Sequence, residues 1–244
     1  MTRILLLAGT AEARALAHRL AAIPGLEVTA SLAGVTTRPA RYAVNVRTGG
    51  FGGAGGLRDW LTRNETDLLL NATHPFATKM EENARQATNE SGIRYLRLLR
   101  PPWPNRSTWL EAEDTNNAAT LIPSGARVLL SGGRKDIGPF IARPDVWFLL
   151  RSIEPIPDLP PHIGSLIAPP AQSLDDEIDL MRSRRITHLI AKNSGGPTMA
   201  RLDAADALRL TTIMIARHPP PPGENVETVD QAVAWVQRHV AIQR

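Results

Sequence analysis

The chain has 244 residues, of which 43% are hydrophobic, enough for one large domain or two compact ones. Glycine and proline, at 18 and 20 residues, stay below the share typical of disordered chains. The formal charge of +4 is spread without a basic tail, which disfavours bulk capture of nucleic acid. Cysteine is absent, which excludes disulfides and thiolate sites. No apolar stretch has the length of a membrane span or signal peptide core, so we expect a cytoplasmic protein.

Apolar runs of strand length alternate with amphipathic stretches through the first half of the chain. Their alternation favours a parallel sheet that is covered by helices on both faces. The predicted strands are residues 3–8, 28–32, 42–47, 67–71 and 94–98, and the predicted helices are residues 12–22, 57–63 and 76–91.

The pattern restarts after the stiff segment Pro101-Pro102-Trp103-Pro104. Ser173 with Asp176 and Thr228 with Gln231 have the spacing of capping boxes and predict two further helix starts. The chain therefore reads as two α/β halves that are joined near residue 100. The predicted strands of the second half are residues 127–131, 146–151, 165–168, 188–191 and 211–215.

Three turns of the first half carry residues suited to a ligand, because open parallel sheets bind ligands where their strands end. Residues 9–14 join the first strand to a helix whose first N–H groups suit a phosphate, although a tight turn explains them equally well. Residues 49–56 include six glycines and a GxGxxG match, which indicates either close backbone approach to a ligand or a mobile loop. His74 either donates a proton or holds the loop at Pro75.

Two loops of the second half combine small residues with a cation. Residues 131–134 read Ser-Gly-Gly-Arg, and residues 192–196 read Lys-Asn-Ser-Gly-Gly ahead of a helix expected near Thr198. The second loop has the composition of an anion site without P-loop spacing. Only three of the 28 basic residues are lysines, which reflects either a GC-rich genome or a need for the forked donors of arginine.

Five motifs in this order resemble the precorrin-6A reductase family of cobalamin biosynthesis: GTAEAR at 9–14, SLAG at 31–34, GGFGGAGGL at 49–57, NATHPFA at 71–77 and KNSGG at 192–196. The resemblance implies two Rossmann-like α/β domains with parallel sheets and the active cleft between them. Residues 1–100 would bind NADP and residues 101–244 would complete the substrate cleft. It also implies NADPH-dependent reduction of precorrin-6A to precorrin-6B, with hydride added at C19 and a proton at C18. A precorrin carries many carboxylates, which suits an arginine-rich cleft.

The resemblance also assigns site residues, and it implies no metal. Catalytic roles fall to His74 and Asn71. The residues expected to bind the cofactor are Gly9, Thr10, Ala11, Glu12, Arg14, Ser31, Gly34, Arg38, Gly50, Phe51, Gly52, Gly53 and Thr73. The residues expected to bind the substrate are Ser131, Arg134, Lys192, Asn193, Ser194, Gly195 and Gly196.

Two positions depart from the family pattern. Asn71 stands where an aspartate is usual, and an amide cannot replace a carboxyl proton donor, which leaves His74 or water. Val35 stands where an arginine commonly follows SLAG. The 2′-phosphate of NADP would then be bound by one of the remaining arginines nearby, which are Arg14, Arg38 and Arg41.

The residues alone leave two other functions open. A two-domain transferase that uses a nucleotide-sugar would employ the same glycine loops for a diphosphate. A carrier that binds a tetrapyrrole or a nucleotide without turnover would have the same two lobes. Neither nucleic acid nor a membrane is expected as a partner, because the chain has no concentrated basic face and no apolar span.

Overall fold

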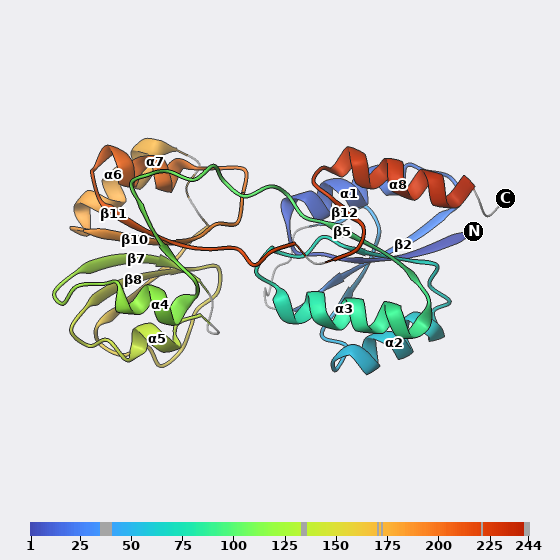
Figure 1. The fold of residues 1–244 in the computed structure, drawn as a ribbon, viewed down its shortest axis with the longest axis horizontal. Helices are drawn as coiled ribbons and strands as arrows, with labels where there is room; N and C mark the ends of the chain where they lie inside the picture. Colours follow the sequence, from blue (N-terminus) through green and yellow to red (C-terminus); the bar gives the residue numbers. More distant parts are fainter. Residues whose placement is uncertain (35–40, 133–135, 170, 172, 221, 242–244) are drawn as a thin grey trace. The chain divides into compact units, whose positions relative to one another are not determined.

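The computed structural model describes residues 1–34, 41–132, 136–169, 171, 173–220 and 222–241. It divides into two compact units, the first made of Met1–Pro101 with Pro219–Arg244 and the second of Pro102–His218 (Figure 1). The chain first crosses from one unit to the other between Pro101 and Pro102. Each unit is an α/β layer structure built on a parallel sheet, as the alternating pattern predicted.

Within the described residues, the first unit has six parallel strands in the order β12-β5-β4-β1-β2-β3. Their bounds are β1 Thr2–Leu7, β2 Leu26–Leu32, β3 Asn45–Thr48, β4 Leu68–Asn71, β5 Arg94–Leu98 and β12 Asn225–Val226. The order reverses between β1 and β4, the place where doubly wound sheets bind their ligands.

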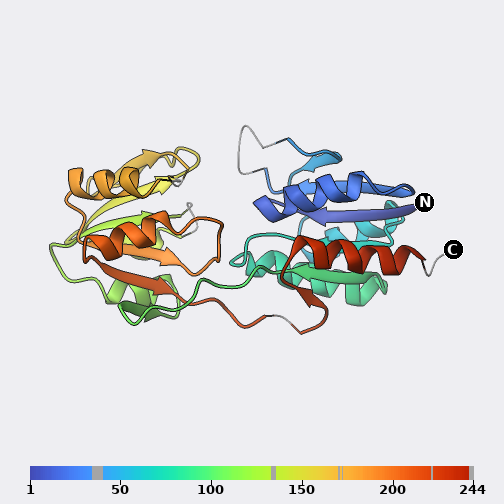
Figure 2. The same ribbon diagram turned by 90° about the horizontal axis from the view of Figure 1, so that it is seen from above.

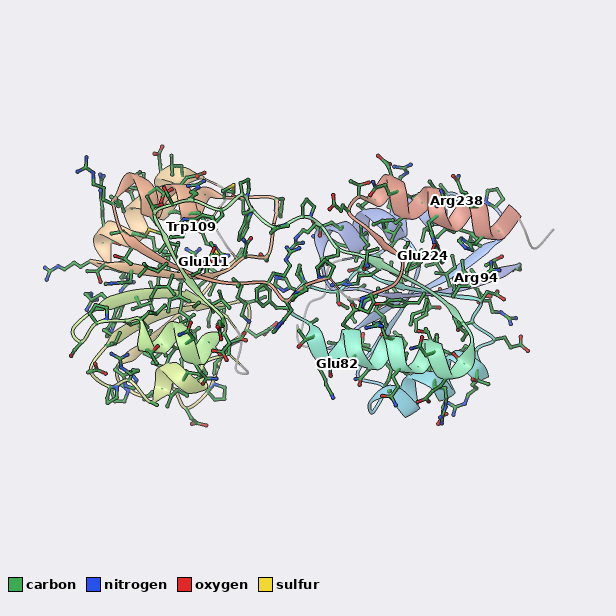
Figure 3. All side chains as sticks on the ribbon, viewed as in Figure 1. Glu82, Arg94, Trp109, Glu111, Glu224 and Arg238 are labelled. Carbon is green, nitrogen blue, oxygen red and sulfur yellow. The ribbon has the colours of Figure 1, made fainter. Side chains whose placement is uncertain are left out.

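Helices cover both faces of this sheet because successive residues of its central strands point to opposite faces, and the residues on each face are apolar. Ile4 and Leu6 of β1 belong to the core beneath α1 (Ala11–Ala21) and α8 (Val229–Ala241), which lie side by side in Figure 2. Leu5 and Leu7 belong to the core of the other face, beneath α2 (Ala54–Arg63) and α3 (Thr78–Ser91). Exposed charges such as Glu82 on α3 and Arg238 on α8 lie on the outer sides of these layers (Figure 3).

The predicted second domain, residues 101–244, extends too far at its C-terminal end. From Pro219 the chain belongs to the first unit, where β12 adds a parallel strand beside β5. There the Arg97 N–H donates to the Glu224 carbonyl at 3.0 Å. The chain returns to the first unit because the apolar face of α8 packs into the core of the first sheet. The buried side chains are those of Ala232, Val233, Trp235 and Val236.

The described part of the second unit has six parallel strands in the order β6-β11-β10-β7-β8-β9. Their bounds are β6 Trp109–Ala112, β7 Arg127–Ser131, β8 Trp147–Ser152, β9 Ile163–Ile167, β10 His188–Lys192 and β11 Thr211–Ile215. The helices are α4 Thr115–Thr120 and α5 Gly138–Ile141 on one face, and α6 Leu174–Ser183 and α7 Ala200–Ala207 on the other (Figure 1).

Both predicted capping boxes are confirmed. The Ser173 hydroxyl accepts from the Asp176 N–H at the start of α6, and the Thr228 hydroxyl accepts from the Gln231 N–H at the start of α8. The sequence patterns missed the shorter elements, which are β6, α4, α5 and β12. No helix within the described ranges is both long and apolar enough to cross a lipid bilayer.

Candidate functional site

The turns of the first unit that were expected to bind a cofactor emerge at one edge of its sheet. Leu7, the last residue of β1, pairs with Ser31 of β2 on one side and with Asn71 of β4 on the other. The Thr10 hydroxyl then donates to the Ala72 carbonyl at 2.8 Å, which ties the turn after β1 to the turn after β4. The two turns are therefore held together across the point where the strand order reverses.

The turn between β1 and α1 leaves helix N–H groups facing outward. Gly9 has φ +124°, and a Cβ at this position would meet no atom within 4 Å. Thr10 caps the helix by accepting from the Ala13 N–H at 3.1 Å, so the N–H groups of Ala11 and Glu12 have no partner inside the helix. Such groups, at the positive end of the helix, suit a phosphate.

Three side chains around this turn have protein partners. Glu12 forms an ion pair with Arg100 at 2.6 Å, so its carboxylate anchors the end of β5. Half-buried Tyr42 lies against the turn, near the Gly9 backbone and the Arg14 side chain. Burial raises the pKa of Tyr42, so the phenol stays protonated at neutral pH. Tyr42 was missed because a tyrosine at the start of an expected strand resembles core packing.

The loop between β3 and α2 is shaped by its glycines. Gly49, Gly52 and Gly53 have positive φ angles of 113°, 81° and 97°. A Cβ at any of these three, or at Gly50, would meet no atom within 4 Å. The loop and the Gly9 turn thus present bare backbone to open space, which fits a nucleotide diphosphate. Gly34 differs, because its Cβ would lie 3.0 Å from the Thr48 methyl group, so this glycine serves the packing of β2 against β3.

Arg47 on β3 is a cation that the sequence patterns missed. Its guanidinium donates to the buried Ser31 hydroxyl at 2.6 Å and to the Gly50 carbonyl at 3.1 Å. It also lies 3.9 Å from the centre of the Phe51 ring. Burial lowers the pKa of Arg47, and no carboxylate of the described residues forms an ion pair with it. Arg47 therefore brings a partly desolvated positive charge to the end of β2, beside the open glycine loop.

Asn71 lies at the centre of a buried polar network at the end of β4. Its side-chain N–H groups donate to Glu81 at 2.8 Å and to the Tyr95 hydroxyl at 3.0 Å. Its side-chain oxygen accepts from the Thr73 hydroxyl at 2.8 Å and from Arg97 at 3.3 Å. Arg97 is 2% exposed and also pairs with Glu81 at 2.8 Å. With every polar atom of its side chain engaged and no exposed surface, Asn71 fixes the loop that follows β4.

His74 extends from that loop and is exposed. Its Nδ1 accepts from the Phe76 N–H at 3.3 Å, so the neutral ring carries its proton on Nε2. Thr73 is held by Asn71, and the Thr73 carbonyl accepts from Arg97 at 3.1 Å. The buried network thus positions a loop whose exposed residue is a proton-bearing imidazole.

In the second unit, the end of β7 and the end of β10 are linked by an ion pair. Lys192 pairs with Asp136 at 2.6 Å, and a Cβ on Gly132 would lie 3.2 Å from the Cβ of Asp136. The Ser131 hydroxyl is buried and has no hydrogen-bond partner among the described residues. Lys192 therefore faces a carboxylate of its own unit rather than standing as an isolated cation.

The loop after β10 forms hydrogen bonds with Trp103, a residue from the start of the second unit. The Asn193 side chain accepts from the Trp103 N–H at 2.8 Å and donates to the Trp103 carbonyl at 3.3 Å. The Trp103 indole N–H donates to the Gly196 carbonyl at 2.9 Å. Ser194 is buried and Gly195 has φ +62°. Within residues 192–196, Asn193 and Gly196 therefore hold Trp103 by three hydrogen bonds.

Arg38 and Arg134 lie outside the described residues, so the geometry bears on neither expectation. The other expected cofactor residues occupy the carboxyl edge of the first sheet, and the other expected substrate residues occupy that of the second. Arg47 had a weak sequence signal, because it is the last charged residue before the glycine loop on an expected strand.

Comparisons with known proteins give one consistent result. A family model described as precorrin-6x reductase CbiJ/CobK matches residues 3–237. Precorrin-6A reductase of Rhodococcus erythropolis is 46% identical over 243 residues, covering 97% of this chain and 98% of the relative. Precorrin-6A reductase of Mycobacterium tuberculosis H37Rv is 43% identical over 242 residues, covering 97% and 98%. The solved structure of CobK precorrin-6A reductase superposes with a TM-score of 0.89 at 37% identity, covering 98% of this chain and 97% of that one.

Proposed function

Since this chain belongs to the precorrin-6x reductase (CbiJ/CobK) family, we propose that it reduces precorrin-6A with NADPH, adding hydride at C19 and a proton at C18. It is an oxidoreductase of cobalamin biosynthesis. Family membership decides against the nucleotide-sugar transferase and the carrier. The observation that carries the cofactor assignment is the row of open glycine turns beside Arg47 at one edge of the first sheet.

The first unit supplies the groups that NADPH requires. The Gly9 turn and the N-terminus of α1 would face the diphosphate, with Thr10 holding the turn to the loop after β4. Gly50, Gly52 and Gly53 would allow the cofactor to approach the backbone closely. When bound, the cofactor supplies the hydride, and this unit supplies orientation and exclusion of water.

Arg47 is our candidate for the 2′-phosphate. In sheets of this order, the residue at the end of the second strand contacts the adenosine ribose, and a nearby arginine accommodates the phosphate of NADP. Arg47 donates to Ser31 at this strand end and has no ion-pair partner among the described residues. A dianionic phosphate would compensate a positive charge that is now partly buried and unbalanced.

His74 is our candidate for the proton donor, and Asn71 is a positioning residue. The Nε2–H of His74 is the proton-bearing end of an exposed imidazole, whereas the Asn71 amide is buried and fully bonded. His74→Ala should lower kcat by about 100-fold or more while leaving the Kd for NADPH within about twofold. An equal loss in both would make His74 a cofactor-binding residue.

The reaction itself is tested by NADPH oxidation with the purified chain, with and without precorrin-6A, and again with NADH. We expect oxidation that depends on the macrocycle and favours NADPH. Arg47→Gln should raise the KM for NADPH by about 10- to 100-fold and leave the KM for NADH unchanged, because NADH lacks the 2′-phosphate. The matched control is Arg63→Gln at the exposed end of α2, which should change neither.

Absence of macrocycle-dependent oxidation in the unmodified chain would overturn the proposed reaction. Equal losses with both nucleotides in Arg47→Gln would instead remove only the assignment of Arg47.

A further inference from the structure

The second unit contains a buried cluster with more positive than negative charge. Arg151 at the end of β8 is 5% exposed, and Glu177 on α6 is fully buried. Arg151 donates to the two Glu177 carboxylate oxygens at 2.5 and 3.1 Å. Arg201, at the start of α7, is close enough for its charge to be influenced by both. Two guanidinium groups therefore lie near one carboxylate, which is bonded to Arg151 alone of the two.

The carboxylate of Glu177 is already engaged by other donors. Besides Arg151, it accepts from the Ala171 N–H at 3.1 Å. The guanidinium of Arg201 makes no hydrogen bond or ion pair with any residue in the described part of the chain. Burial lowers the pKa of Arg201, as expected for a cation that has lost water without gaining a bonded partner.

Arg201 is nevertheless accessible, since part of its surface remains exposed. It lies over the ring of Trp103, 5.7 Å from the ring centre. Trp103 is in turn fixed by Asn193 and Gly196 on the loop after β10. The guanidinium thus sits on a rigid aromatic support near the carboxyl ends of β8 and β10, where ligands of parallel sheets bind.

We propose that Arg201 binds a carboxylate side chain of the tetrapyrrole substrate, with Trp103 as its support and the Arg151–Glu177 pair behind it. This inference rests on the proposed function, which supplies a substrate rich in carboxylates. A guanidinium offers paired N–H groups that match the two oxygens of a carboxylate. An unbalanced buried charge is costly, so binding of an anion at this position is favoured.

The test is steady-state kinetics of Arg201→Gln with precorrin-6A at saturating NADPH. We expect the KM for the macrocycle to rise by about 10- to 100-fold, with the Kd for NADPH unchanged. Arg182→Gln is the matched control, because Arg182 is an exposed arginine on α6 with the same change of charge. It should retain the KM of the unmodified chain.

Thermal unfolding separates a binding role from a structural one. Arg201→Gln removes a partly buried charge that has no bonded partner among the described residues, so we expect its Tm to equal or exceed that of the unmodified chain. Addition of guanidinium ion at millimolar concentration to Arg201→Ala should lower the raised KM, because the small cation can occupy the space beside Trp103. An unchanged KM in Arg201→Gln, or a lowered Tm with KM unaffected, would overturn the inference.

The outcome also distinguishes this inference from the proposed function. If the unmodified chain oxidises NADPH with precorrin-6A and Arg201→Gln does so with the same KM, the carboxylate site is wrong and the reaction stands. If the unmodified chain shows no turnover, the proposed reaction fails first, before Arg201 is tested.

Discussion

The two units have the same strand order around their centres. They differ in whether the arginines near the carboxyl edge of the sheet are paired with carboxylates. In the first unit, the central strands run β3-β2-β1-β4-β5, and in the second they run β9-β8-β7-β10-β11. The first unit balances its buried Arg97 with Glu81 and with backbone carbonyls. The second leaves Arg201 unbalanced beside Arg151 and Glu177. The same topology provides a ligand-binding edge in both, but local side chains decide what that edge binds.

The largest expected loss of stability comes from breaking the buried ion pair between Arg97 and Glu81 in the first unit. Arg97→Met should lower the free energy of unfolding by about 3–5 kcal/mol, because it leaves Glu81 without its buried partner. Urea unfolding followed by circular dichroism measures the loss. Arg94→Met is the control, since Arg94 is exposed at the start of the same strand (Figure 3), and it should change stability by less than about 0.5 kcal/mol. Equal losses in the two variants would contradict a special role for Arg97.

The comparison is sharpest when Arg97→Met is measured beside Arg201→Gln. Each variant removes one guanidinium charge, yet the first should destabilise the protein and the second should not. The difference follows from the carboxylate that each arginine leaves behind. Glu81 loses its ion pair, whereas Glu177 keeps both bonds to Arg151.

The next effect concerns two adjacent glycines of α2. A Cβ on Gly56 would lie 1.8 Å from the Phe51 carbonyl oxygen, so Gly56→Ala must displace the loop and should cost about 1–3 kcal/mol. Since Phe51 lies under Arg47, binding of NADPH should weaken as well. A Cβ on Gly55 meets nothing, so Gly55→Ala should stabilise the helix by up to about 1 kcal/mol. Thermal unfolding measures both, and effects of the same sign would contradict the assigned close approach.

Asn193 tests the counterpart loop in the second unit. Asn193→Ala leaves the Trp103 N–H and carbonyl without their partners and should cost about 1–3 kcal/mol. Its KM for precorrin-6A should rise as well, because Arg201 loses a fixed support. Exposed Asn116 on α4 provides the control, and Asn116→Ala should change neither quantity. A raised KM with unchanged stability would restore Asn193 as a direct substrate ligand.

The sequence predicted best those elements whose signal is local. Residues 94–98, 127–131 and 211–215 match β5, β7 and β11 to the residue. The second and third contain a consecutive apolar run, whereas the first contains two arginines among its apolar residues. β6 was missed, since this edge strand has two exposed residues among its four. α8 was recognised as an amphipathic helix. Its periodicity indicates that one face is buried, but it does not indicate which of the two sheets that face packs against.

The residues of the candidate site also differ in how far the sequence alone could predict them. The open glycine turns were identified because a run of glycines is visible in the sequence itself. Arg47, Arg97 and Arg201 were missed because their environments depend on partners brought together by folding. Arg97 meets Asn71, which is 26 residues away, and Arg201 meets a tryptophan from the start of its unit. A charge is common at the surface, and only the folded chain shows that Arg97 is buried and that Arg47 and Arg201 are partly buried.

The smallest expected effect is an acid sensitivity confined to the second unit. Hydrogen bonds from Arg143 lower the pKa of Asp145 from its ordinary 3.8 to about 2. A carboxyl whose pKa is lower in the folded state stabilises the protein above its unfolded pKa, and that contribution is lost as the pH falls from about 4 to about 2. The Tm of Asp145→Asn should therefore lie slightly below that of the unmodified chain at pH 6, and the gap should close toward pH 2. A constant gap for Asp145→Asn would mean that its contribution is not the ion pair with Arg143.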